Sequence, residues 1–304
     1  MQTAETFVLT PPEDQEDYSL VYQWFALEDG GIWSIALMES HGGLKPYDPQ
    51  TDGDSYDWES WNAAKQEKYL LCHYAENGTL ISAIPANELE DYQRLDSGDL
   101  GNVKRFECVG GVLYMTLFDN RVVQIDKETA GVSEVSDLNK VNTSYNIKTL
   151  CFDRDGKPLL IQEKVENIAP DVPSKIDELT LSEFDLATST CLQMIYTTGN
   201  DWNRTSFDVL KGSGEYRLFI NTYSKLIGIR DDGSQELLID IDASDLKPQI
   251  MTPDDCTPPY TDPELFDLKI VPLDDTKFLA RYKHYPECRT DAFCLTRKHG
   301  SEIG

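Results

Sequence analysis

Residues 110–129 read GGVLYMTLFDNRVVQIDKET, and this stretch contains the signals that decide the fold. A Gly-Gly turn precedes an apolar run at 112–117, and a second apolar run at 122–125 ends in the turn 126–129. Glycine suits hairpin turns because it tolerates positive φ, and Asp and Thr cap turns by accepting hydrogen bonds from nearby backbone N–H groups. The stretch therefore predicts two β-strands, each bounded by a tight turn.

The same order of turns and apolar runs recurs along the chain. A tight turn followed by an apolar run occurs at 29–38, 110–117, 155–161, 212–220 and 274–282. A second turn follows later in the unit at 77–78, 126–129, 185–188 and 232–233. Each unit reads as strand, turn, strand, connection, strand, turn and strand, which is typical of a four-stranded propeller blade.

We therefore predict an all-β protein, a β-propeller of about five four-stranded antiparallel blades in a single domain that spans residues 1–304. The blades are expected at approximately 17–86, 102–136, 146–197, 206–242 and 265–298. A single blade cannot bury both of its faces, so the blades must stack on one another.

The last unit holds only three strand-like runs, whereas residues 6–10 form a strand-like run without a unit of its own. Pairing of 6–10 with the outer edge of the last blade would close the ring and remove an exposed sheet edge. The alternative is an unstructured N-terminal tail. Ring closure by the N-terminal strand is our prediction.

The composition is strongly acidic, with 54 Asp and Glu against 27 Lys and Arg, a net charge of -27 and a pI near 4.3. Such a surface repels phosphate backbones, so we predict no nucleic-acid partner. It favours solubility and could also attract cationic partners or divalent ions. No apolar run is long enough to span a membrane, and the first residues lack the features of a signal sequence.

The seven cysteines are irregularly spaced and form no metal-binding motif with the four histidines. Four lie in apolar strand-like runs and are predicted to be buried thiols that fill core space: Cys72, Cys108, Cys151 and Cys191. Cys288 and Cys294 flank a polar turn and could form a disulfide across a hairpin, or remain reduced.

The sequence lacks the usual motifs of catalysis. Gly-x-Ser-x-Gly, His-Glu-x-x-His and phosphate-binding glycine loops do not occur. We predict that the chain is not an enzyme. The alternative is a propeller glycoside hydrolase or lyase with carboxylates at the central channel, for which Asp17, Asp208 and Asp267 fall near proposed inner strands.

Residues 40–67 form a long polar insertion in the first unit. Tyr56, Trp58 and Trp61 in this insertion could stack on a sugar or anchor a partner, because exposed aromatic residues dominate binding hot spots. Alternatively, the two tryptophans fold back and cap the propeller. Tyr260, in the Pro-rich connection 251–264, is a further candidate contact residue.

The same insertion is rich in carboxylates. Asp52, Asp54 and Asp57 could ligate Ca²⁺, which takes several oxygen ligands from a flexible loop. Their spacing does not match a helix-loop-helix calcium site, because the acidic twelfth position is not in place. We therefore expect no cofactor, with Ca²⁺ at these three residues as the alternative.

The repeats IDKET (125–129) and FDLAT (184–188), with the closing run FCLTRK (293–298) and Ser301-Glu302-Ile303, resemble a known family. The chain is similar to the N-terminal β-propeller region of surface lipoproteins of gut Firmicutes, in which the propeller precedes an extracellular solute-binding domain of a transport system. The resemblance covers the whole chain and supplies no functional residues.

The resemblance implies a protein that is exported to the cell surface. We predict a non-catalytic binding propeller that assists solute or glycan capture, with a carbohydrate, a peptide or a protein as partner. A cytoplasmic scaffold is the alternative location and role.

Overall fold

The computed structural model describes residues 18–28, 30–48, 50–53, 56–89, 103–166, 175–198, 207–221, 225–240, 269–272, 277–283 and 290–296. The chain divides into two compact units. Unit 1 comprises residues 1–141 with the short segment 186–189, and unit 2 comprises 142–185 with 190–304.

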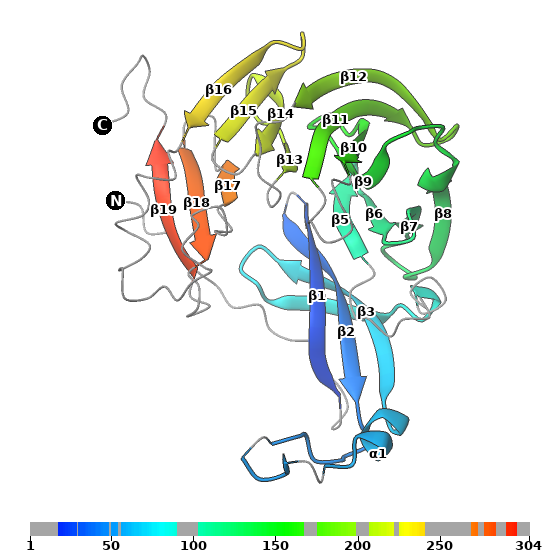
Figure 1. The fold of residues 1–304 in the computed structure, drawn as a ribbon. Helices are drawn as coiled ribbons and strands as arrows, with labels where there is room; N and C mark the ends of the chain where they lie inside the picture. The colour runs from blue at the N-terminus through cyan, green and yellow to red at the C-terminus, as the bar shows by residue number, and fades with distance from the viewer. Residues whose placement is uncertain are drawn as a thin grey trace. The chain divides into compact units, whose positions relative to one another are not determined.

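Unit 1 holds two antiparallel sheets in which each strand pairs with the next along the chain (Figure 1). The first sheet consists of β1 (Ser19–Glu28), β2 (Gly31–Ser40), β3 (Gln66–Ala75) and β4 (Leu80–Pro85). The second consists of β5 (Val103–Val109), β6 (Val112–Leu117), β7 (Arg121–Ile125) and β8 (Val132–Asp137). The described part of the unit also includes the short helix α1 (Trp58–Ala63) between β2 and β3, and the 3-10 helix η2 (Leu138–Lys140) after β8.

Unit 2 repeats this arrangement with three sheets (Figure 1). The third sheet holds β9 (Asn146–Phe152), β10 (Pro158–Glu166), β11 (Lys175–Asp185) and β12 (Thr190–Thr198). The fourth holds β13 (Asp208–Lys211), β14 (Tyr216–Asn221), β15 (Lys225–Arg230) and β16 (Gln235–Asp240). The last holds β17 (Lys269–Pro272), β18 (Lys277–Lys283) and β19 (Thr290–Thr296).

The turns of the second sheet form for the reasons that the sequence suggests. Gly110 and Gly111 connect β5 to β6 with φ of 57° and 82°, a region that side chains rarely adopt. In the turn after β7, the Asp126 carboxylate accepts hydrogen bonds from the Thr129 backbone N–H at 2.7 Å and from its hydroxyl at 2.8 Å. These bonds confirm the predicted turn-capping role of the Asp-x-x-Thr pattern.

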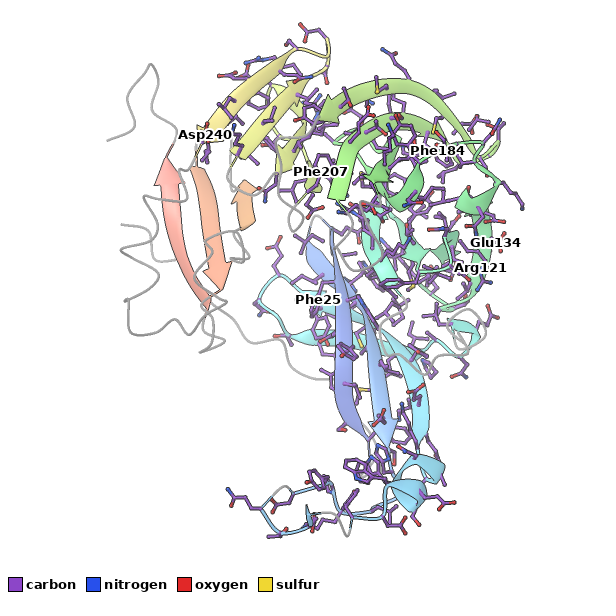
Figure 2. The ribbon with its side chains drawn as sticks, viewed as in Figure 1. Phe25, Arg121, Glu134, Phe184, Phe207 and Asp240 are labelled. Carbon is purple, nitrogen blue, oxygen red and sulfur yellow. The ribbon has the colours of Figure 1, made fainter. Side chains whose placement is uncertain are left out.

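The two sheets of unit 1 bury their facing sides in one shared core. Ile35 and Leu71 of the first sheet join Leu113, Met115 and Ile125 of the second, and all five side chains are essentially excluded from solvent. The edge strands are more polar, and Glu134 on β8 is exposed (Figure 2). The sheets therefore stack as propeller blades do, because neither buries its apolar face alone.

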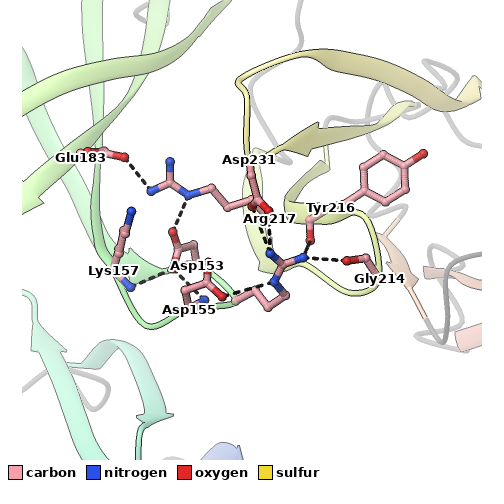
Figure 3. Close-up of polar contacts among 9 residues, drawn as sticks. Asp153, Asp155, Lys157, Glu183, Gly214, Tyr216, Arg217 and Asp231 are labelled. Carbon is pink, nitrogen blue, oxygen red and sulfur yellow. Dashed lines mark hydrogen bonds and ion pairs between the residues drawn. The ribbon is translucent and has the colours of Figure 1, made fainter.

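Unit 2 is held together by an apolar core and by a polar network. Leu159 and Leu181 of the third sheet share a core with Leu218 and Ile220 of the fourth. Beside it, the β9–β10 turn contacts β14, where Arg217 pairs with the fully buried Asp153 (Figure 3). Two kinds of contact thus join these sheets, the non-directional apolar core and a directional ion pair.

The structure confirms the all-β class and four four-stranded antiparallel blades of propeller type. The last sheet has three strands, in line with the three runs seen in the sequence. Residues 6–10, predicted to supply its fourth strand, lie outside the described residues. Five complete blades and a closed ring stay predictions.

Three of the four predicted core cysteines are confirmed as buried: Cys72, Cys108 and Cys151. Burial raises the pKa of the Cys72 thiol to about 11, so this thiol stays protonated at neutral pH. The prediction for Cys191 is wrong, because this residue lies on the edge strand β12 and is exposed. Cys288 lies outside the described residues, and with it the predicted bond to Cys294.

Within the described ranges, no helix is long and apolar enough to cross a membrane. The longest helix there, α1, has six residues.

Candidate binding surface

The insertion between β2 and β3, residues 41–65, is organised by short-range hydrogen bonds. The Asp48 carbonyl accepts hydrogen bonds from the backbone N–H of Thr51 at 3.1 Å and of Asp52 at 2.9 Å. The Asp52 carboxylate in turn accepts from the Asp48 backbone N–H at 2.8 Å and pairs with Lys45 Nζ at 3.1 Å. The first half of the insertion is therefore a closed turn rather than an extended loop.

The second half of the insertion forms α1, which lies beyond the ends of β2 and β3 (Figure 1). Asp57 is its N-cap and accepts hydrogen bonds from the Ser60 backbone N–H at 2.9 Å and from the Ser60 hydroxyl at 2.6 Å. Glu59 lies in the first turn, where a negative charge favours a helix. No residue of α1 is buried, so capping and the contacts below must hold it in place.

A chain of contacts joins α1 to the first sheet. The Glu39 carboxylate, at the end of β2, accepts a hydrogen bond from His41 Nε2 at 2.5 Å and pairs with Lys65 Nζ at 3.1 Å. His41 Nδ1 lies 2.9 Å from the Trp61 carbonyl oxygen, and the two rings stack with centroids 3.5 Å apart. The buried His41 thus contacts both α1 and the end of β2, and so links the insertion to the sheet.

Three further rings pack on one another at the surface of the insertion. The centroid of Tyr56 lies 5.3 Å from that of Tyr47 and 4.8 Å from that of Trp58, and Tyr47 and Trp58 are 5.0 Å apart. The Tyr56 hydroxyl donates to the Lys45 carbonyl at 2.6 Å. We call these three residues the aromatic face.

The aromatic face is open to solvent. Trp58 is 50% exposed and Tyr47 is 38% exposed, and the neighbouring Leu44 is exposed as well. Large exposed side chains that already touch one another lose little conformational freedom when a ligand covers them. The arrangement can therefore bind a flat or extended ligand by stacking and apolar contact.

Charge around the aromatic face is mostly negative. Hydrogen bonds from the Asp48 backbone and from Lys45 lower the pKa of Asp52, and those from Ser60 lower the pKa of Asp57. Both carboxyls are ionised at neutral pH. Loss of solvent contact and the charges of these two carboxylates raise the pKa of Tyr56, so its phenol stays neutral.

The structure brings together the three predicted aromatic residues of the insertion but gives them different roles. Trp61 stacks on His41, whereas Tyr56 and Trp58 form the open surface. Capping of the propeller by the two tryptophans stays untested. Tyr47 was missed by the sequence reasoning, although it lies in the same insertion. Tyr260 lies outside the described residues.

The carboxylates proposed for Ca²⁺ are engaged in local structure. Asp52 closes a turn and Asp57 caps α1, whereas Asp54 lies outside the described residues. Among the residues that the structure describes, no group of three His, Cys, Asp or Glu side chains is placed to hold a metal ion. The expectation of no cofactor, with Ca²⁺ at the three aspartates as the alternative, stays untested.

One of the three carboxylates of the glycosidase alternative lies among the described residues, so this alternative stays untested. Asp208 is the first residue of β13, and its carboxylate accepts a hydrogen bond from the Val209 backbone N–H at 2.8 Å. Asp17 and Asp267 lie outside the described residues.

The attachment of the insertion should depend on pH through Glu39. Partial burial raises the pKa of this carboxyl, but the hydrogen bonds from His41 and Lys65 outweigh that effect and lower it below its usual value. A lowered folded-state pKa means that the stabilisation is complete above the unfolded pKa near 4.5 and is lost as pH falls through the folded value.

We expect the near-ultraviolet circular dichroism of the aromatic residues of the insertion to decrease over the acidic interval below the unfolded pKa near 4.5. The Glu39→Gln variant should show a weaker signal at pH 7 and little further change over this interval, because a charge-assisted hydrogen bond is worth about 1.5–3 kcal/mol. An unaltered pH response in the variant would show that Glu39 does not hold the insertion.

The repeated four-stranded antiparallel sheets define an all-β protein of the β-propeller class, and the insertion adds an exposed aromatic surface to its first blade. No protein-family model matches the chain, and no curated protein matches it. Several solved structures are weakly similar to this chain.

YCF48 bound to D1 peptide has 10% identity and a TM-score of 0.34, over 97% of this chain and 99% of that one. YCF48 from Cyanidioschyzon merolae has 9% identity and a TM-score of 0.32, over 87% and 95%. BamB from Moraxella catarrhalis has 9% identity and a TM-score of 0.26, over 93% and 81%. These similarities are too low to transfer a ligand or partner, so the proposals below depend on this chain's own residues.

Proposed function

We propose that this chain is a non-catalytic binding module that holds its ligand on the aromatic face formed by Tyr47, Tyr56 and Trp58. The single observation that carries the proposal is the contact among these three rings, which leaves Trp58 half exposed at the end of a sheet. Trp and Tyr in such clusters are the residues that most often dominate binding energy.

The physical support is preorganisation. A half-exposed tryptophan gains little by packing against its own chain alone, since much of its apolar surface remains in water. Here the turn closed by Asp52, the cap at Asp57 and the Glu39–His41 hydrogen bond each restrain part of the insertion. A ligand would therefore meet a surface that is already in place, and binding would cost little ordering.

Two wider parts of the proposal are independent of this surface. We propose that residues 6–10 complete the three-stranded sheet β17–β19, because a fourth strand would pair with the backbone groups of an edge strand. We also propose a location at the cell surface, which the resemblance of the repeats 125–129 and 184–188 to surface propellers supports.

The binding proposal can be tested by presenting the chain to arrays of glycans and peptides and measuring the affinity of each hit. Trp58→Ala should weaken binding by about 30-fold or more, the loss that corresponds to a hot spot of about 2 kcal/mol. Phe118→Ala is the matched control, because Phe118 is 53% exposed but lies in the turn after β6.

Affinity for the best hit should be unchanged in the control. A hit whose binding survives Trp58→Ala, with the variant folded by far-ultraviolet circular dichroism, would place the ligand elsewhere and contradict the proposal.

A further inference from the structure

We propose that the aromatic face binds a cationic partner, specifically an extended peptide segment that carries arginine or lysine. This inference rests on the proposed function and adds the chemical class of the ligand. Three observations support it. Exposed carboxylates are adjacent to Trp58 in the sequence, the two lysines of the insertion are already paired, and unit 1 contains a contact between a tryptophan, a carboxylate and a lysine.

The insertion has an excess of negative charge that its own cations do not offset. Residues 41–65 contain five acidic side chains and two lysines. Lys45 pairs with Asp52 at 3.1 Å, and Lys65 pairs with Glu67 at 2.6 Å and with Glu39 at 3.1 Å. Both lysines thus form ion pairs with carboxylates of this chain.

The acidic residues on either side of Trp58 remain exposed. Asp57 precedes Trp58 and Glu59 follows it, and both are exposed in the structure. The Asp57 carboxylate accepts hydrogen bonds from the Ser60 backbone N–H and hydroxyl, which are uncharged donors, so it keeps its negative charge. A cationic segment that reaches the exposed indole would therefore also approach a stretch of the insertion with exposed negative charge.

Unit 1 contains a group in which a tryptophan, a carboxylate and a cation contact one another. The Trp33 indole N–H donates to Glu28 at 2.7 Å, Lys127 Nζ pairs with Glu28 at 2.6 Å, and the same Nζ lies 5.1 Å from the centroid of the Trp33 ring. The carboxylate thus accepts from the indole and pairs with the cation, and the cation lies over the indole ring. Cation–π attraction and charge pairing act together in such a group.

The aromatic face has two members of this combination and lacks the third. Trp58 and two exposed carboxylates adjacent to it in the sequence are present, but among the described residues no Lys or Arg lies over the Trp58 ring. A guanidinium would suit the position, because it is planar, stacks on aromatic rings and pairs with carboxylates. The net charge of -27 would also draw a basic segment toward the chain over a longer range.

The test uses three dye-labelled probes of similar length: a peptide of alternating Arg and Gly, the same peptide with Glu in place of Arg, and a neutral cello-oligosaccharide. Affinities are measured by fluorescence anisotropy at about 50 mM and about 500 mM NaCl. We expect the Arg peptide to bind more tightly than the other two probes. Its affinity should fall about tenfold or more at the higher salt.

Variants distinguish the aromatic face from general attraction to an acidic protein. Asp57→Asn with Glu59→Gln removes two charges and retains the helix cap, since Asn also caps helices. Glu128→Gln with Glu134→Gln removes two exposed charges of the second sheet and is the charge-matched control. We expect the first pair to weaken Arg-peptide binding about tenfold and the second pair to change it less than twofold.

The outcomes separate this inference from the proposed function. Equal effects of the two variant pairs, or Arg-peptide binding that survives Trp58→Ala, would overturn the cationic ligand. If only the oligosaccharide or the Glu peptide binds, and Trp58→Ala abolishes that binding, the cationic ligand is wrong and the proposed surface stands. If a probe binds and Trp58→Ala leaves it bound, the surface itself is wrong.

Discussion

Arg217→Met should lower the free energy of unfolding by about 3–5 kcal/mol, the largest loss that we expect from one polar substitution. Arg217 Nε donates to Asp153 Oδ2 at 2.5 Å, and its Nη2 pairs with Glu183 at 2.7 Å. Asp153 is fully buried and lies between the third and fourth sheets of unit 2 (Figure 3). Removing the guanidinium leaves this carboxylate buried and without its charge partner.

The measurement is urea denaturation of the variant and of two controls. Lys225→Ala breaks a pair of exposed side chains, Lys225 and Asp240, at 3.8 Å and should cost about 1 kcal/mol or less. Adding Asp153→Asn to Arg217→Met should recover part of the loss, because the buried charge is gone while an oxygen can still accept from the Asp155 and Lys157 N–H groups. No recovery in the double variant would show that packing, not charge, causes the loss.

Leu113→Ala should lower the free energy of unfolding by about 2–5 kcal/mol, because it opens a cavity in the core that the two sheets of unit 1 share. Leu113 is 0% exposed and pairs with Ile125 across the second sheet. Leu192→Ala on the exposed face of β12 removes the same atoms from a position in contact with solvent and should change stability by about 0.5 kcal/mol or less.

The two large substitutions also test the prediction of a single domain, since Leu113 lies in unit 1 and Arg217 in unit 2. If the units unfold together, each substitution shifts one common transition. If they unfold separately, each shifts only the transition of its own unit, and the two-state treatment then applies to each unit rather than to the chain. Separate transitions would contradict the single-domain prediction.

Local signals in the sequence predicted the repeated sheets well, because turns and strand periodicity depend on neighbouring residues. The Asp126–Thr129 turn forms with the hydrogen bonds that its residue types suggest. The apolar run around Cys191 predicted a strand correctly, but it could not show that this strand lies at the edge of its sheet. Edge and centre differ in their neighbours and not in their own sequence.

The contacts that place the candidate surface were harder to predict, because they join residues by three-dimensional proximity. Trp58 stood out as an aromatic residue in a long insertion, but nothing in the pattern separated it from Trp61, which stacks on His41. Tyr47 joins the aromatic face only because the turn closed by Asp52 brings it back. The pairing of Asp153 with Arg217, 64 residues apart, leaves no local signal at all.

We propose that this protein binds its ligand at the insertion between β2 and β3. Hydrogen–deuterium exchange with and without the tightest ligand from the arrays tests it without assuming the site. We predict slower exchange in peptides that cover residues 44–61, in the wild type and in Phe118→Ala, and no such protection in Trp58→Ala. Protection confined to other segments, with 44–61 unchanged in the wild type, would contradict the account.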